Sequence, residues 1–195
     1  MKNSAIIVVD MLYDFIDGSL ACLNACNAVA ESRKYISKAV NVDDFDENGI
    51  VDTIPVLFIR DHHPANHCSF TENGGIWPVH CVAGTHGGDI HDDLKEFVNE
   101  DLTFDKGCDP ACEQYSGFEG CNAAGQSLSE VLDLLGITDV YLCGIATEFC
   151  VRNTAADLKK AGYRIHLLQK CVAYVNEDGH KEAIAQMKAE GIMME

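Results

Sequence analysis

Residues 140–151 read VYLCGIATEFCV, in which a short apolar run passes through Gly144 into a helical pattern that continues to residue 161. The apolar run is typical of a buried strand in a parallel sheet, and the pattern after it is typical of a helix. Threonine is favoured at helix N-caps, so we take Thr147 as the N-cap, which places Cys150 in the first helical turn. A strand followed directly by a helix is the unit from which α/β sheets are built.

The same alternation of apolar runs and helical patterns recurs along the chain. We expect three further strands, which cover residues 5–9, 55–59 and 163–168. We expect three further helices, which cover residues 27–40, 126–135 and 178–190. Because strands that alternate with helices form βαβ crossovers, the pattern predicts a mostly parallel α/β sheet covered on both faces. The chain has no internal repeat and no linker rich in Pro, Gly or Ser, so we expect one domain over residues 1–195.

Composition excludes several classes of function. The 195 residues include 31 Asp or Glu and 14 Lys or Arg, so the formal net charge is −17. Such a charge repels phosphate backbones and anionic lipids, and we expect no nucleic-acid or membrane partner. No apolar stretch approaches the roughly 18 residues needed to cross a bilayer, and the apolar run 5–9 is too short for a secretion signal. We therefore expect a cytoplasmic protein.

The ten cysteines occur singly or four apart, as in Cys22 with Cys26 and Cys108 with Cys112. This spacing lacks the Cys-x-x-Cys pairs of zinc ribbons, and the chain is larger than most disulfide scaffolds, so we expect reduced thiols. For Cys108 and Cys112 a disulfide or a secondary metal site stays open as the alternative to a bystander role.

One acidic segment resembles the start of a calcium-binding loop. Asp44, Asp46 and Asn48, followed by Gly49, match the opening of an EF-hand loop, but Pro55 stands where the closing acid belongs. We interpret the segment as a solvated acidic loop, with weak calcium binding as the alternative.

Polar side chains follow the predicted strands at the edge of the sheet where ligands bind in open parallel α/β folds. Asp10 follows the first strand, Asp61 follows the second, and Cys150 follows the strand quoted above. Lys106 follows a further segment, residues 102–105. We expect these four side chains to meet at one rim of the sheet.

Cys150 is the candidate nucleophile. The helix N-terminus should favour its thiolate, and the free backbone N–H groups there can stabilise an oxyanion. Asp10 can accept the thiol proton and pass it to a leaving amine, while the Lys106 ammonium stabilises the thiolate. The alternatives are a small buried hydrophobic residue for Cys150, and ordinary turn residues for Asp10 and Lys106.

Asp61 and His63 are candidate metal ligands. They lie two residues apart, so on an extended segment their side chains point to the same side. His80 is the best third ligand, and the set of two histidines and one carboxylate leaves coordination positions for water or substrate. The alternative is that these histidines only make hydrogen bonds in a loop.

Six motifs together resemble the nicotinamidase (pyrazinamidase) branch of the isochorismatase-like cysteine hydrolase superfamily. They are VVDMLYDF (8–15), RDHHPANHCSF (60–70), WPVHCV (77–82), DKG (105–107), YSGF (115–118) and GIATEFCV (144–151). The first and last motifs mark the superfamily, and Asp-x-His with a later His marks the nicotinamidase branch. The chain departs from the family in residues 107–114, which form a longer and more cysteine-rich segment before Tyr115.

The resemblance implies a three-layer α/β/α fold and the hydrolysis of nicotinamide to nicotinate and ammonia in NAD salvage, with pyrazinamide as a further substrate. It implies a catalytic triad of Asp10, Lys106 and Cys150. It also implies one divalent metal ion, zinc, iron or manganese, on Asp61, His63 and His80. Whether the chain forms a homo-oligomer stays open.

The resemblance also describes the substrate pocket. It implies an oxyanion hole from the backbone N–H groups of Ala146 and Cys150, with a cis peptide bond between Ile145 and Ala146. The positions that line the pyridine pocket in the family are matched by Phe15, Trp77 and Tyr115.

Two other functions stay open. One is a metal-independent or carbamoyl- or ureido-specific amidase of the same superfamily, and the other is a catalytically silent metal-binding or thiol-redox protein. Ammonia release that survives chelation would favour the first. Absence of release from metal-loaded protein, for any carboxamide, would favour the second.

Overall fold

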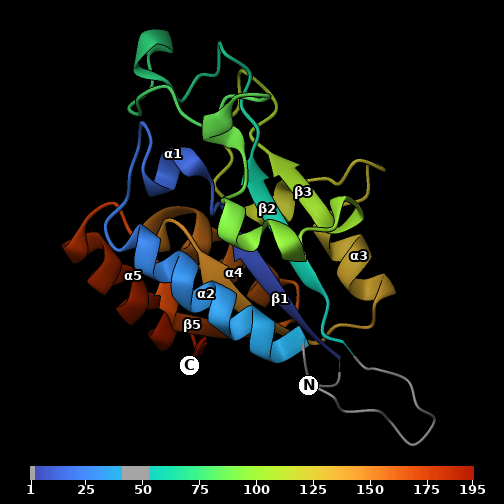
Figure 1. Cartoon of the computed structure of the whole chain (residues 1–195). Coiled ribbons are helices and arrows are strands. Elements are labelled where there is room, and N and C mark those ends of the chain that lie inside the picture. Colours follow the sequence, from blue (N-terminus) through green and yellow to red (C-terminus); the bar gives the residue numbers. More distant parts are fainter. Residues whose placement is uncertain (1–2, 41–52) are drawn as a thin grey trace, which may run out of the picture.

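The computed structural model describes residues 3–40 and 53–195. A six-stranded, all-parallel sheet forms the centre of this part, in the order β3-β2-β1-β4-β5-β6 (Figure 1). The strands are β1 (Ser4–Val9), β2 (Val56–Asp61), β3 (Thr103–Lys106), β4 (Asp139–Gly144), β5 (Arg164–Val172) and β6 (Met193–Met194). The parallel sheet predicted from the sequence is confirmed.

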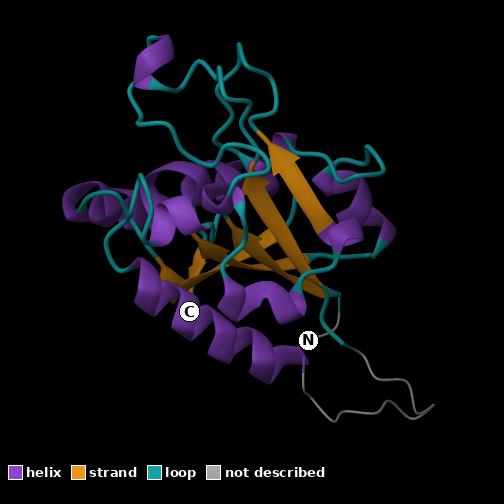
Figure 2. Cartoon of the chain, turned by 45° about the horizontal axis from the view of Figure 1, so that its top comes forward, coloured by secondary structure: helices purple, strands orange, loops and turns teal. Residues whose placement is uncertain are grey.

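Helices cover both faces of the sheet, which gives three layers (Figure 2). The α-helices are α1 (Tyr13–Ile16), α2 (Ala25–Val40), α3 (Leu128–Leu134), α4 (Arg152–Lys160) and α5 (Glu177–Ala189). A π-helical turn, η6 (Thr147–Val151), precedes α4. The short 3-10 segments are η1 (Thr71–Asn73), η2 (His86–Gly88), η3 (Asp92–Phe97), η4 (Glu100–Leu102) and η5 (Gly117–Glu119).

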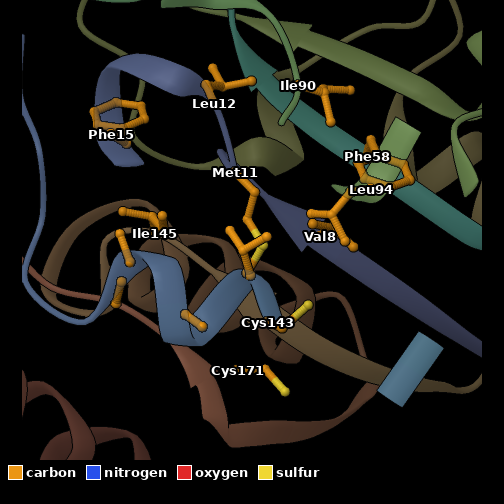
Figure 3. Packing of buried hydrophobic residues seen from close by; sticks show 14 of the residues in the cluster. Val8, Met11, Leu12, Phe15, Phe58, Ile90, Leu94, Cys143, Ile145 and Cys171 are labelled. Carbon is orange, nitrogen blue, oxygen red and sulfur yellow. The ribbon is translucent and has the colours of Figure 1, made fainter. Parts of the chain in front are cut away.

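The alternation of side chains along β1 divides the core into two parts. Ile6 and Val8 pack with α2 on one face, whereas Ile7 and Val9 pack with α3, α4 and α5 on the other. Figure 3 shows the first cluster, in which Val8 lies beside α2. Because β1 is buried on both faces, it is apolar at successive positions, as central strands of α/β folds are.

The observed elements differ from the predicted ones in two places, and a third prediction cannot be compared. The edge strand β6 is too short to form an apolar run, so the pattern could not indicate it. Thr147 is not the N-cap of a helix, because its hydroxyl donates to the Ala173 carbonyl at 2.9 Å and Ala146 occupies the cap position. The acidic segment with Asp44, Asp46 and Asn48 lies outside the described residues.

The predicted helix over 126–135 is present as α3, and its start has a clear local cause. The Ser127 hydroxyl accepts from the Glu130 N–H while the Glu130 carboxylate accepts from the Ser127 N–H, which forms a capping box. None of the helices in the described ranges is long and apolar enough to cross a bilayer.

Candidate active site

Four neighbouring strands deliver one chemically active side chain each to the same edge of the sheet. Asp10 directly follows β1, Asp61 and Lys106 end β2 and β3, and Cys150 lies in the turn after β4. Asp61 and Lys106 are direct register partners across β2 and β3. The order β3-β2-β1-β4 therefore brings together the four side chains that the sequence placed at strand ends.

Lys106 is the centre of this cluster. Its Nζ lies 2.9 Å from Asp10 Oδ2 and 3.5 Å from Cys150 Sγ, and it also forms an ion pair with Asp61. The side chains of Lys106 and Asp10 are fully buried, with 0% exposure each. Asp10 Oδ1 accepts a hydrogen bond from the Asp61 backbone N–H at 3.0 Å. The base, the ammonium and the thiol thus form one dry, connected group.

The environment sets the protonation of this group. Burial, followed by the charge of Asp61, raises the pKa of Asp10 to about 6. Burial raises the pKa of the Cys150 thiol well above its ordinary value, and the opposing effect of Lys106 is smaller. Lys106 favours the thiolate, but desolvation has the larger effect on the pKa, so the thiol needs a base that takes its proton. At neutral pH the group contains an ionised base beside a protonated thiol.

Two glycines let the backbone come close enough to form this site. Gly144 has a φ of +136°, and a Cβ there would lie 2.1 Å from the Val9 carbonyl oxygen. Gly107 has a φ of +67°, and a Cβ there would lie 2.4 Å from Cε1 of His63. Glycine is needed at both positions, where β4 ends beside β1 and where the His63 ring lies against the chain after Lys106.

A second group of buried side chains is suited to hold a metal ion. One carboxylate oxygen of Asp61 and one ring nitrogen each of His63 and His80 lie within 4.8 Å of one another. His63 Nδ1 lies 3.0 Å from the Gly107 carbonyl oxygen, and His80 Nδ1 lies 2.7 Å from the Pro78 carbonyl oxygen. A carbonyl oxygen only accepts, so both Nδ1 atoms carry the hydrogen and both Nε2 atoms keep a lone pair.

The donor set passes a further test of fit. His63 Nε2 is buried and makes no hydrogen bond, although it lies 3.5 Å from Asp61 Oδ2. A buried, unpaired imidazole nitrogen facing a carboxylate and a second imidazole is what a divalent metal ion would satisfy. Burial also lowers the pKa of His80 and favours the neutral ring that metals bind.

His67 lies beside this group but does not belong to it. Its ring stacks on His63 with centroids 4.0 Å apart. Both ring nitrogens have partners, since Nδ1 lies 2.7 Å from Ser69 Oγ and Nε2 lies 3.0 Å from the Cys112 carbonyl oxygen. His67 therefore supports the His63 ring and offers no free nitrogen.

An aromatic pocket connects the thiol with the histidines. It is lined by the three side chains expected there, Phe15, Trp77 and Tyr115, and also by Asp61, His80, Ala146 and Cys150. Trp77 Nε1 donates to the Tyr115 hydroxyl at 3.1 Å, which fixes these two walls relative to each other. The cis peptide bond expected between Ile145 and Ala146 is present.

Comparison with known proteins places this arrangement in a family. The model for the isochorismatase domain matches residues 4–195. The chain belongs to the isochorismatase family. One member, the nicotinamidase/pyrazinamidase of Mycobacterium tuberculosis, is 33% identical over 192 residues, which cover 96% of this chain and 96% of that protein.

Two solved structures show how far the isochorismatase-family fold is shared. The pyrazinamidase of Pyrococcus horikoshii in complex with zinc has a TM-score of 0.83 at 37% identity, and the match covers 99% of this chain and 98% of that one. PnC1 from L. infantum in complex with nicotinate has a TM-score of 0.82 at 29% identity, and the match covers 99% of this chain and 92% of that one. The predicted isochorismatase-like α/β fold is confirmed.

The isochorismatase-family pocket also has walls that the sequence did not indicate. They are Leu20, Cys22, Glu113, Phe149 and Val175. Phe149 stands next to Cys150 in the last motif, which was a usable signal, and its ring meets Trp77 edge-on at 5.1 Å. Glu113 lies in the cysteine-rich segment 107–114, and burial together with the charge of Asp61 raises its pKa. The other three residues come from loops with no recognisable pattern.

Glu148 is a further residue that motif reasoning passed over. Its Oε1 accepts from the backbone N–H groups of both Val175 and Asn176 at 2.9 Å. Because Glu148 lies in η6, two residues before Cys150, these bonds tie one wall of the pocket to the turn that carries the thiol.

Proposed function

We propose that this chain hydrolyses nicotinamide to nicotinate and ammonia as a step of NAD salvage, and that it also accepts pyrazinamide. The observation that carries the proposal is one aromatic pocket lined by the Cys150 thiol and by Asp61 and His80 of the metal-ligand set, with the Lys106 ammonium in contact with both Cys150 and Asp10. This arrangement suits a flat ring that has a carboxamide on one side and a ring nitrogen on the other. The zinc and nicotinate complexes of the two solved relatives support the same assignment.

The metal-ligand set has a defined part in this proposal. Asp61, His63 and His80 would hold the ion, and zinc, iron and manganese all accept imidazole with carboxylate. When bound, the ion supplies a Lewis acid for the ring nitrogen, which orients the substrate in the pocket. Phe15, Trp77 and Tyr115 enclose the ring and exclude water from it.

Acylation uses the triad Asp10, Lys106 and Cys150. The Asp10 carboxylate accepts the thiol proton as Cys150 Sγ forms a bond to the carboxamide carbon. The Lys106 ammonium, 3.5 Å from the sulfur, stabilises the negative charge as it develops. The backbone N–H groups of Ala146 and Cys150 stabilise the oxyanion. Asp10 then gives its proton to the leaving nitrogen, and the C–N bond breaks to release ammonia and leave a thioester.

Deacylation repeats the two proton transfers of Asp10 with water as the nucleophile and the sulfur as the leaving group. The Asp10 carboxylate takes a proton from a water molecule, and the hydroxyl forms a bond to the thioester carbon. The C–S bond breaks, the sulfur regains a proton from Asp10, and the carboxylic acid product loses its remaining proton to solvent and leaves as nicotinate. A carboxyl with a pKa of about 6 suits both proton transfers, because it is mostly ionised at neutral pH and still gives up a proton more readily to the leaving group than it would if its pKa were far above neutrality.

The test is ammonia release by purified protein with nicotinamide, pyrazinamide and an N-carbamoyl compound, before and after chelation. We expect release from the two aromatic carboxamides, loss on chelation, and recovery with zinc, iron or manganese. Release that survives chelation, or preference for the carbamoyl compound, would assign the chain to the other amidases. No release from any substrate by metal-loaded protein would assign it to a silent metal-binding or thiol-redox protein.

The proposal also includes the cellular location and the number of domains. We place the enzyme in the cytoplasm as a single domain over residues 1–195. All ten cysteines are free, which suits a reducing compartment. The Cys108 and Cys112 thiols are both exposed, so trapping free thiols in cells with a membrane-permeable alkylating reagent tests this placement.

A further inference from the structure

A second set of side chains in the site has the composition of a metal centre. One carboxylate oxygen each of Asp10 and Asp61 and the Cys150 sulfur lie within 4.8 Å of one another, and all three residues are buried. Carboxylate oxygen and thiolate sulfur are both ligands that zinc accepts. The set differs from the first group in two of its three members.

Lys106 lies where the ion of this second set would lie. Its ammonium is 2.9 Å from Asp10 Oδ2 and 3.5 Å from Cys150 Sγ, and it pairs with Asp61 Oδ1. All three potential ligands are therefore already in contact with one positive charge. Apart from its ion pair with Lys106, Asp10 Oδ2 makes no hydrogen bond, although it is fully buried.

Asp61 connects the two cation positions. Its Oδ1 pairs with Lys106, while its Oδ2 lies 3.5 Å from His63 Nε2 in the first group. A carboxylate that places one oxygen on each of two neighbouring cations is the arrangement found in two-metal sites. Here one of the two cations is a side chain of the protein itself.

We propose that Asp10, Asp61 and Cys150 form a latent second metal site, which the Lys106 ammonium fills and so closes to thiophilic divalent ions. Lysine is suited to this task because an ammonium forms hydrogen bonds and ion pairs but no coordinate bond. It leaves the sulfur lone pair available for attack and the Asp10 carboxylate available for a proton. A divalent ion in the same place would coordinate both groups and remove the nucleophile and the base together.

The proposal gives Lys106 a role that charge stabilisation alone does not. Removal of the ammonium leaves the buried Asp10 and Asp61 carboxylates without a cation, which is costly unless they take up a proton or another cation enters. The neutral variant Lys106→Met should therefore acquire a metal ion that the parent excludes. This consequence depends on the ligand geometry and holds whatever the substrate is.

The experiment titrates chelated protein with Co²⁺, a spectroscopic substitute for zinc. Bound Co²⁺ is counted by equilibrium dialysis, and a near-ultraviolet thiolate-to-cobalt absorption band reports a Co–S bond. We expect Lys106→Met to bind one more Co²⁺ than the parent and to show the band. We expect Lys106→Arg to bind the same number of Co²⁺ ions as the parent, and neither of these two proteins to show the band. An equal count and no band in Lys106→Met would overturn the proposal.

Two further variants assign the band. In Lys106→Met/Cys150→Ser the band should vanish and the additional Co²⁺ should bind at least about 100-fold more weakly, since even outer-shell changes cost about 10–100-fold. A band that persists there would come from another cysteine and would refute the assignment. Lys106→Met/Asp10→Asn removes one charge of each sign, so it covers the case that Lys106→Met does not fold. It keeps the Asp61 oxygen and the Cys150 sulfur, so it should show the band at a higher Co²⁺ concentration, and absence of the band at every concentration would overturn the proposal.

The number of bound Co²⁺ ions relative to the parent separates a failure of this proposal from a failure of the proposed function. If Asp61, His63 and His80 bind no metal, the parent count falls to zero, but the additional ion in Lys106→Met stays. If the parent binds metal and hydrolyses nicotinamide while Lys106→Met gains nothing, only the latent site is wrong.

Discussion

Alkylation of Cys150 as a function of pH should follow the ionisation of Asp10 and not that of the thiol. Burial and Asp61 raise the pKa of Asp10 to about 6, while burial raises the pKa of Cys150 well above its ordinary value. A reaction that needs a pre-formed thiolate would therefore rise only in strongly alkaline solution. A reaction in which Asp10 takes the proton during attack should rise through pH 6 and level off near neutrality.

The expected size of this step follows from the pKa. A carboxyl with a pKa of about 6 is ionised to about 10% at pH 5 and about 90% at pH 7, so the rate should rise roughly tenfold between them. Lys106 lowers the pKa of both Asp10 and Cys150, so its removal raises both values. In Lys106→Ala the step should move to higher pH, and in Asp10→Asn it should disappear.

The assay is the rate of iodoacetamide labelling of the Cys150 peptide, measured by mass spectrometry in metal-free protein between pH 5 and 9. Peptides with the exposed Cys108 and Cys112 supply an internal control, because these two thiols do not belong to the cluster of Asp10, Lys106 and Cys150. A flat Cys150 profile between pH 5 and 7, or a step that survives in Asp10→Asn, would refute the assignment of the base. Superimposable curves for the parent and Lys106→Ala would remove Lys106 from the site.

Three further predictions concern the nucleophile, the metal and the backbone. Cys150→Ser should lose nearly all ammonia release while its thermal unfolding stays close to that of the parent, and retained turnover would contradict the nucleophile assignment. Single alanine substitutions in the metal group should lower bound metal and activity together, whereas unchanged metal content by elemental analysis would argue against the set Asp61, His63 and His80. Gly107→Ala should lower the free energy of unfolding in denaturant by about 1–3 kcal/mol and should also lower metal affinity, because the new Cβ would displace the His63 ring. Unchanged stability and metal affinity would show that the backbone at this position adapts to a side chain.

The sequence predicted those features that depend on local pattern. Continuous apolar runs identified β1, β2, β4 and β5, because strands buried on both faces need apolar residues at successive positions. The residues after those runs identified the cluster at the sheet edge, because parallel strands all end on the same side. Strand order was not encoded in this pattern, although it decides which side chains touch.

The features that the sequence missed depend on tertiary contacts. Thr147 has the chemistry of an N-cap, but the Ala173 carbonyl lies close enough to accept its hydroxyl. Cys150 has the position of an activated thiolate, but burial raises its pKa more than Lys106 lowers it. Glu113 and Val175 reach the pocket from loops, and no periodicity marks loop residues that will line a cavity.

The strand order explains why a metal-ligand set and a cysteine nucleophile can share one small pocket. Asp61 ends β2, between β3 with Lys106 and β1 with Asp10, so its two carboxylate oxygens face different neighbours. One oxygen faces Lys106 and, beyond it, the thiol that follows β4, and the other faces His63. A metal ion held on the second side is thereby separated from the sulfur by one carboxylate and one ammonium. If Lys106 keeps metal ions away from Cys150, as proposed, its presence is what allows a thiol nucleophile to work beside a metal centre without becoming a ligand.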